Sequence, residues 1–161
     1  MRVRNSEREG FSLIELVIVI AILAILTGGI ALSYNLVRSA DTKGTAYDID
    51  SNLTNFKSRS MGSNKQIYMH LYRYSGDIYV DYTEEESYTP AGAGEMIGDS
   101  EVTVSCDATV MADGSVTTIA IQKKDGAFVK GPKEIKVSDG DSSSYVVYLI
   151  KDTGKHYVEE K

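Results

Sequence analysis

The most constraining feature of this 161-residue chain is an apolar stretch near its N-terminus, because no residue between Leu16 and Leu32 is charged. These 17 residues span about 26 Å as an α-helix, close to the thickness of a bilayer hydrocarbon core, about 30 Å. Flanking residues can supply the difference. The sequence therefore predicts one membrane-inserted helix attached to a more polar body.

A short charged segment precedes this stretch. Residues 1–10 contain three arginines and two glutamates and end in Gly10. Their excess positive charge favours retention of this end in the cytoplasm. We therefore expect a single-pass protein in the cytoplasmic membrane, with its N-terminus inside and most of the chain outside.

The order of residues at the junction is specific: Gly10 is followed by Phe11, then Glu15, then the apolar stretch. Over about the first 32 residues this pattern resembles the cleavage region of type IV prepilins and type II secretion pseudopilins. The resemblance implies that a membrane-embedded aspartyl prepilin peptidase cuts between Gly10 and Phe11 and methylates the new amine of Phe11. These residues are its substrate, so we expect no catalytic residue and no enzyme here.

Two residues of this pattern have physical reasons for their positions. The missing side chain of Gly10 lets extended backbone enter a peptidase site. An ionised carboxylate such as Glu15 costs roughly 2.5 to 3.5 kcal/mol at the centre of a membrane helix. The resemblance implies that Glu15 pairs with the N-terminal amine of Phe11 in a neighbouring subunit. An ordinary secretory signal or a plain membrane anchor is the alternative interpretation of residues 11–32.

The period of the apolar residues changes along the chain. Apolar residues recur with helical spacing at Ala46, Ile49, Leu53 and Phe56. From about residue 64 they recur at every second residue, as in strands. We therefore expect an α+β fold with a helix of about 50 residues, about 75 Å long, packed on an antiparallel sheet. The expected parts are a leader that is removed (1–10), a hydrophobic transmembrane and filament-core helix (11–32), its amphipathic continuation (33–62) and an antiparallel β domain (63–161).

The β domain is expected to consist of hairpins. Strands are predicted at residues 67–72, 78–82, 101–106, 116–121, 127–130, 145–150 and 156–159, the first half-buried, with turns at the glycines 76, 114, 126, 140 and 154. Residues 84–98 hold Pro90 and three glycines and are predicted to be an exposed loop. The charged residues of the helix are predicted to face solvent, namely Asp41, Lys43, Asp48, Asp50 and Lys57.

Other residue types give weaker indications. Cys106 is the single cysteine and is predicted to be a buried structural thiol, with an intermolecular disulfide as the alternative. His70 and His156 lie in separate predicted strands, so we expect no metal site and no cofactor. Residues 139–144 could offer oxygens to calcium, but their spacing is not that of an EF-hand and a solvated turn is preferred. Tyrosines such as Tyr68 and Tyr88 suit strands or a contact surface.

The net charge of −6 argues against nucleic-acid binding, which needs a basic surface. Partners implied by the resemblance are the peptidase, other pilin or pseudopilin subunits, and indirectly an assembly platform and ATPase. The filament would lie at the cell surface or in the periplasm. Three roles stay open: a structural pilus subunit, a minor pseudopilin that initiates a filament for secretion or DNA uptake, and a surface binding module that does not polymerise.

Departures from the commonest pilins bear on these roles. The chain lacks a C-terminal cysteine pair and a helix proline, and it has Gly28 and Gly29 inside the apolar stretch instead. Close helix packing is the expected reason for the two glycines, and local melting is the alternative. Residues 110–114 and 151–155 faintly resemble the H-type minor pseudopilin domain.

Overall fold

The structure is a computed structural model that describes residues 12–140 and 144–161, with the backbone alone for residues 28–38. Helix α1 (Leu13–Gly62) begins in one compact unit and continues from Val37 in a second unit that holds all the strands described. The strands are β1 (Tyr68–Tyr74), β2 (Asp77–Thr83), β3 (Glu95–Gly98), β4 (Thr103–Cys106), β5 (Thr109–Val110), β6 (Val116–Ile121), β7 (Phe128–Lys130), β8 (Glu134–Ser138), β9 (Ser144–Ile150) and β10 (Lys155–Glu160).

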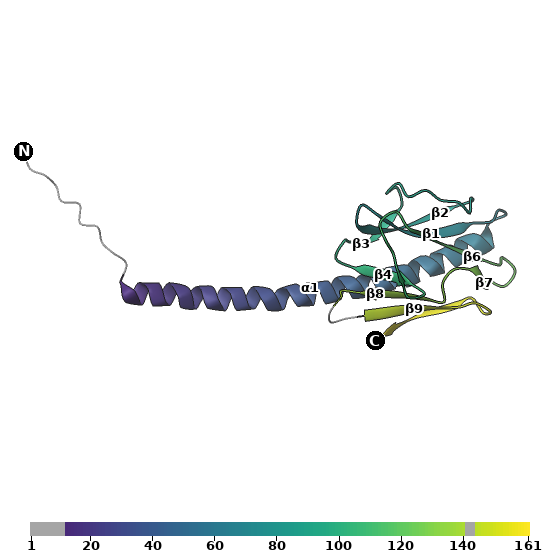
Figure 1. Ribbon diagram of the computed structural model, residues 1–161. Helices are drawn as coiled ribbons and strands as arrows, with labels where there is room; N and C mark the ends of the chain where they lie inside the picture. Colours follow the sequence, from purple (N-terminus) through teal and green to yellow (C-terminus); the bar gives the residue numbers. More distant parts are fainter. Residues whose placement is uncertain (1–11, 141–143) are drawn as a thin grey trace, which may run out of the picture. The chain divides into compact units, whose positions relative to one another are not determined.

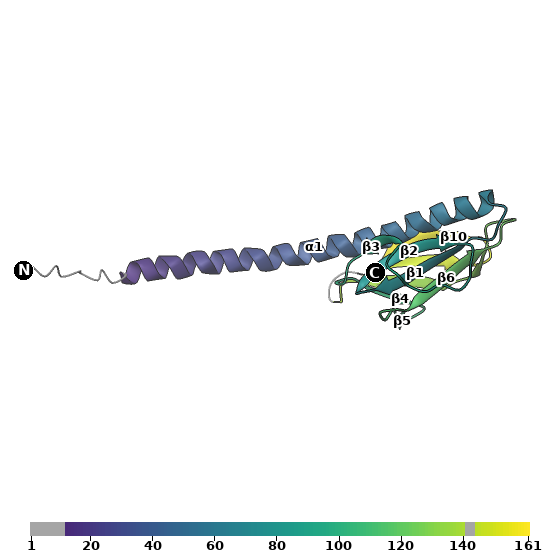
Figure 2. The ribbon, with the colours of Figure 1, turned by 90° about the horizontal axis from the view of Figure 1, so that it is seen from above.

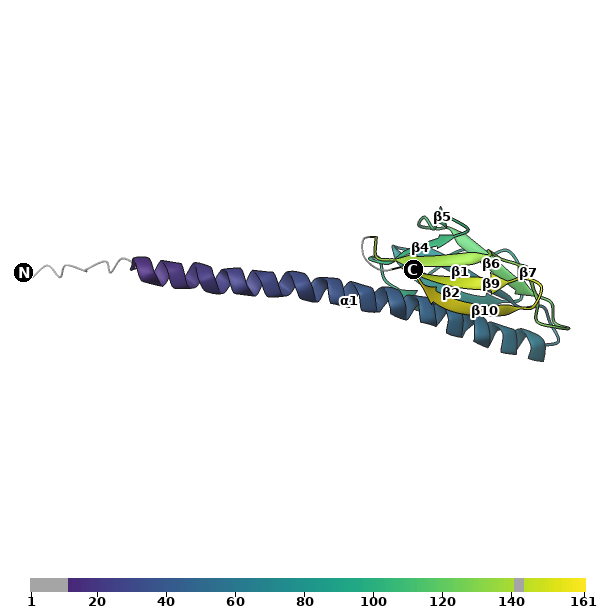
Figure 3. The ribbon, with the colours of Figure 1, turned by 90° about the horizontal axis from the view of Figure 1, so that it is seen from below.

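In the second unit the strands form two antiparallel sheets (Figure 1). Sheet A has the order β3-β2-β1-β6-β7, and sheet B has the order β10-β9-β8-β4-β5. Viewed from above, the C-terminal part of α1 runs alongside sheet A (Figure 2). Viewed from below, the same helix lies next to β10, an edge strand of sheet B (Figure 3). The predicted α+β fold, a helix packed on antiparallel sheets, is confirmed.

The amphipathic part of α1 supplies the centre of the core. Ala46, Ile49, Leu53 and Phe56 are all fully buried, as their helical spacing predicts. They pack with the inward residues of both sheets in one apolar cluster. Each large side chain of this kind contributes about 1.5–3 kcal/mol when buried, so α1 is the main element that holds the two sheets together.

Polar contacts attach α1 to one strand of each sheet, β2 in sheet A and β10 in sheet B. The Tyr82 hydroxyl of β2 donates to the backbone oxygen of Asn52, at 3.1 Å. On the other side, His156 Nε2 of β10 lies 3.1 Å from Thr54 Oγ1. Lys57 Nζ donates to the Gly154 carbonyl at 2.6 Å, so the prediction that Lys57 simply faces solvent is wrong. Lys57 instead provides a hydrogen-bond donor for a backbone carbonyl in the turn between β9 and β10.

Four of the five predicted glycine turns join paired strands. Gly76, Gly126, Gly140 and Gly154 have positive φ and connect β1 to β2, β6 to β7, β8 to β9 and β9 to β10. Gly114 also has positive φ, but it leads from β5 in sheet B to β6 in sheet A. The hairpin predicted there is wrong, because β6 pairs with β1 rather than with its predecessor.

The predicted loop at residues 84–98 is partly wrong. Its last four residues form the edge strand β3, in which Ile97 is buried. Gly94 is needed here because a Cβ would lie 2.4 Å from the Val80 carbonyl oxygen. Strands β5 and β8 were not predicted, although Ile135 and Val137 of β8 alternate with polar residues.

Strand β1 is buried on both faces, so the prediction of a half-buried strand is wrong. His70 and Tyr72 are fully buried on the second face, beneath residues that follow β2. The ring of Tyr88 stacks on His70 with centroids 4.6 Å apart, and the Gly94 amide donates to the Tyr72 hydroxyl at 3.0 Å. The segment between β2 and β3 therefore covers the sheet rather than extending into solvent.

Burial of His70 predicts a pH-dependent stability. Its ring nitrogens lie 3.1 Å from Thr118 Oγ1 and 2.8 Å from Thr83 Oγ1. Burial lowers the pKa of His70 from its ordinary 6.5, although the Glu85 carbonyl and the Asp81 carboxylate oppose this shift. Below about pH 6.5 the unfolded chain binds more protons than the folded one, so stability falls as the pH is lowered.

We expect the urea midpoint of the full chain in detergent to fall between about pH 7 and about pH 5, and to fall less in His70→Gln. Near-UV circular dichroism of the tyrosines measures both midpoints. All other titrating groups are common to the two proteins. Equal decreases in the two proteins would show that His70 does not carry the effect.

Candidate processing and assembly site at the start of α1

Helix α1 begins immediately after Ser12, which acts as its N-cap. Ser12 Oγ accepts a hydrogen bond from the Glu15 amide at 3.2 Å, and the Ser12 carbonyl accepts one from the Leu16 amide at 3.2 Å. A serine hydroxyl in this position satisfies an amide that has no partner within the helix. Helix α1 therefore starts at Leu13.

The N-cap at Ser12 was not predicted, although the sequence contains the spacing that indicates it. Ser12 and Glu15 have the spacing of a capping box, Ser-x-x-Glu, in which the first side chain caps the third helical amide. The structure contains the bond from the Glu15 amide to the serine. Ser12 thus defines where the helix begins.

Glu15 lies in the first turn of α1, and its side chain is exposed. The partial positive charge at a helix N-terminus stabilises a carboxylate in this turn by about 0.3–1 kcal/mol. Because its side chain is exposed, its carboxylate can bind a group outside the chain. Between Leu13 and Leu26, Glu15 is the only charged residue.

The surface around Glu15 is apolar on all sides of the helix. Every described side chain from residue 12 to residue 27 is exposed, and the exposed fraction reaches 81% at Leu13 and 76% at Ile25. Thr27, the last residue of this segment, donates its hydroxyl to the carbonyls of Leu23 and Ala24, at 2.8 and 3.1 Å. A helix without a polar face is stable in lipid or among other helices, not in water.

The other predicted residues of this site are only partly described. Gly10 and Phe11 lie outside the described residues. Gly28 and Gly29 lie in the continuous helix α1, of which only the backbone is described there. In the part of the chain that the structure describes, no helix is both long and apolar enough to cross a membrane.

The remaining candidates lie in the second unit and are not brought together. His70 is within sheet A, while His156 lies beside α1, with Nε2 3.7 Å from Asp50 Oδ1. Among the described residues, no group of three or more histidine, cysteine or acidic side chains could hold a metal. Of residues 139–144, the middle three are outside the described part.

Cys106 differs from its predicted environment. It is only partly buried, at the end of β4, and it accepts a hydrogen bond from Thr117 Oγ1 at 3.4 Å. Burial raises the pKa of the Cys106 thiol, so the less reactive protonated form is favoured. The thiol is thus kept protonated at neutral pH although it is not fully enclosed.

The tyrosines whose side chains the structure describes do not form one exposed contact surface. Tyr72 is fully buried, and Tyr82 packs against Phe56 with ring centroids 6.3 Å apart. Tyr74 and Tyr157 are exposed, but they belong to different sheets. These residues therefore serve mainly the strands and the core, as their β propensity suggests.

Comparison with known proteins agrees with the geometry at the start of α1. The family model of the prokaryotic N-terminal methylation motif matches residues 5–31. The N-terminal segment therefore carries the prepilin-type methylation motif of type IV pilins and pseudopilins. Members of this family are generally non-enzymatic structural proteins, and the prepilin motif implies processing by prepilin peptidase and assembly with other pilins. No curated protein and no solved structure matches the chain.

The cap at Ser12 predicts a local effect on helix stability. Ser12→Ala removes the acceptor for the Glu15 amide and is expected to cost about 1 kcal/mol, or about fivefold faster exchange of that amide. Ser12→Asp keeps an acceptor and is expected to exchange like the wild type. Hydrogen exchange by NMR in detergent micelles measures the rate. Unchanged exchange in Ser12→Ala would contradict the capping role.

Proposed function

We propose that this chain is a structural subunit of a type IV pilus or a pilus-like filament, which prepilin peptidase processes between Gly10 and Phe11. The observation that carries this proposal is the start of α1, where one exposed carboxylate, Glu15, lies on a helix that is otherwise apolar on every side. Such a helix end fits a polymer core in which each carboxylate meets the amine of a neighbour.

The apolar segment serves two environments in turn. Before assembly, residues 11–32 lie in the cytoplasmic membrane with the N-terminus inside. During assembly, the same side chains leave lipid and become buried against the helices of neighbouring subunits, so no apolar surface is exposed to water. An assembly platform and an ATPase supply the force.

Cleavage creates the partner that Glu15 needs. It removes residues 1–10 and leaves a positively charged, methylated amine on Phe11, so that Glu15 becomes the fifth residue of the mature chain. A buried charge is costly unless it is paired, and removal of one partner from a buried pair costs about 3–5 kcal/mol. The pair between Glu15 and the Phe11 amine of the neighbour therefore fixes the axial register of the subunits.

A minor pseudopilin is the second candidate. The chain has one cysteine, Cys106, and therefore no intrachain disulfide, and its apolar helix contains Gly28 and Gly29 without a proline. Both features depart from the commonest major pilins and favour a minor subunit of a secretion or DNA-uptake filament. Substoichiometric amounts of the chain in sheared fibres would support this role, and abundance would support the first.

The test is Glu15→Ala, with Glu15→Asp as the matched control that keeps the charge. Glu15→Ala is expected to be inserted and cleaved normally but to be lost from the sheared fibre fraction, because the amine of the neighbour loses its partner. Glu15→Asp is expected to retain part of the assembly. Immunoblotting of membrane and fibre fractions measures both steps. Assembly of Glu15→Ala at the wild-type level would refute the proposal.

A further inference from the structure

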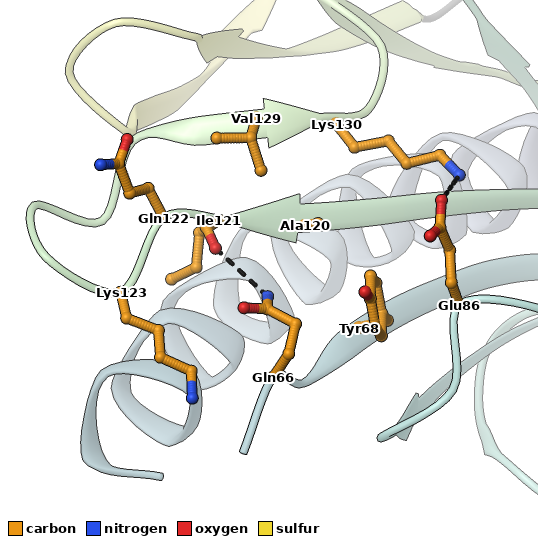
Figure 4. A pocket seen from close by; sticks show the side chains of 9 residues that line it. All are labelled: Gln66, Tyr68, Glu86, Ala120, Ile121, Gln122, Lys123, Val129 and Lys130. Atoms are coloured by element: carbon orange, nitrogen blue, oxygen red, sulfur yellow. Dashed lines mark hydrogen bonds and ion pairs between the residues drawn. The ribbon is translucent and has the colours of Figure 1, made fainter. Parts of the chain in front are cut away.

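The outer face of sheet A contains an open groove of about 420 Å³ between β1, β6 and β7 (Figure 4). Tyr68, Ala120 and Val129 give it an apolar lining, and Val129 is 60% exposed. The amide of Gln66 donates to the Ile121 carbonyl at 3.2 Å and closes one end. This apolar surface is uncovered in the single chain.

The rim of the groove is basic although the chain as a whole carries a charge of −6. Lys123 and Lys130 line it from opposite ends of the β6–β7 hairpin. Lys130 Nζ lies 2.5 Å from a Glu86 carboxylate oxygen, but both side chains are about half exposed, so this pair is weak. The groove therefore suits an apolar residue that is surrounded by carboxylates.

The same unit carries a surface of that kind. Met96 of the edge strand β3 is 58% exposed. It borders a hollow that Asp41 and Asp48 of α1 and Asp99 after β3 also line, and among the described lining residues none is basic. Its neighbour Glu95 is exposed as well. We call this region the Met96 surface.

The groove and the Met96 surface lie at opposite ends of the second unit along α1. The Met96 surface adjoins residues 40–48, where this unit begins. The groove includes Gln66, just beyond the end of α1 at Gly62, and the neighbouring turn at Gly126 approaches Lys57 and Met61. From residue 44 to residue 62 the helix rises about 27 Å.

We propose that the Met96 surface of one copy docks into the basic-rimmed groove of another copy of this chain. This contact rests on the proposed function, because a polymer with parallel α1 helices brings the residue-40 end of one subunit over the residue-62 end of another. The two surfaces differ, so the contact is heterologous and continues from copy to copy without closing. Lys123 and Lys130 then face the carboxylates around Met96, which favours the correct orientation.

Cysteine cross-linking in assembled filaments tests this contact. All variants carry Cys106→Ser, so that only introduced thiols react. Met96→Cys combined with Val129→Cys is expected to give a ladder of covalent dimers, trimers and higher species after mild oxidation with copper phenanthroline. Each single variant is expected to stay monomeric, because a heterologous contact pairs two different positions. Val110→Cys replaces Val129→Cys as the control, since Val110 is equally exposed, at 59%, but lies in sheet B.

Charge reversal at the rim provides a second measurement. Lys123→Glu in the double-cysteine chain is expected to reduce the ladder severalfold, and Lys136→Glu in sheet B is expected to leave it unchanged. Filaments that form without the Met96–Val129 ladder, or that give the ladder with Val110, overturn this contact and leave the proposed function intact. The absence of any filament from the Cys106→Ser chain overturns the proposed function and the contact with it.

Discussion

The helix from Leu13 to Leu26 has apolar side chains on every side, and no described residue of its own unit covers them. Water is therefore an unfavourable environment for this segment, and lipid or other helices are favourable ones. The single charge at Glu15 lies in the first turn, where the helix dipole and an external cation can both stabilise it. The proposed cycle of membrane storage and polymerisation follows from these two properties.

The second unit uses the same helix differently. From Ala46 to Phe56, α1 has one apolar face, and that face is the centre of the core. Hydrogen bonds at Asn52, Thr54 and Lys57 attach the helix to both sheets. A subunit held in this way can display strands and loops on its outer surface while its N-terminal helix is buried among neighbours.

Local patterns predicted most of the secondary structure because they need no distant partner. The helical stripe at Leu53 and Phe56 and the turn glycines, such as Gly76, are of this kind. His70 is buried because the ring of Tyr88 covers it. This contact joins two separate segments, so the spacing of apolar residues within one segment does not predict it. The pairing of β6 with β1 is likewise set by packing of the whole unit. At the site, Glu15 was identified from sequence, and Ser12 was overlooked despite its capping-box spacing.

The proposed function requires that the apolar helix stays on the mature chain and that this chain begins at a new amine, on Phe11. Mass spectrometry of the native protein from membranes and sheared fibres measures this directly. The account predicts an N-terminus at Phe11 that carries one methyl group, with residues 12–161 intact behind it. A chain that still starts at Met1, or one trimmed beyond Leu32, would contradict it.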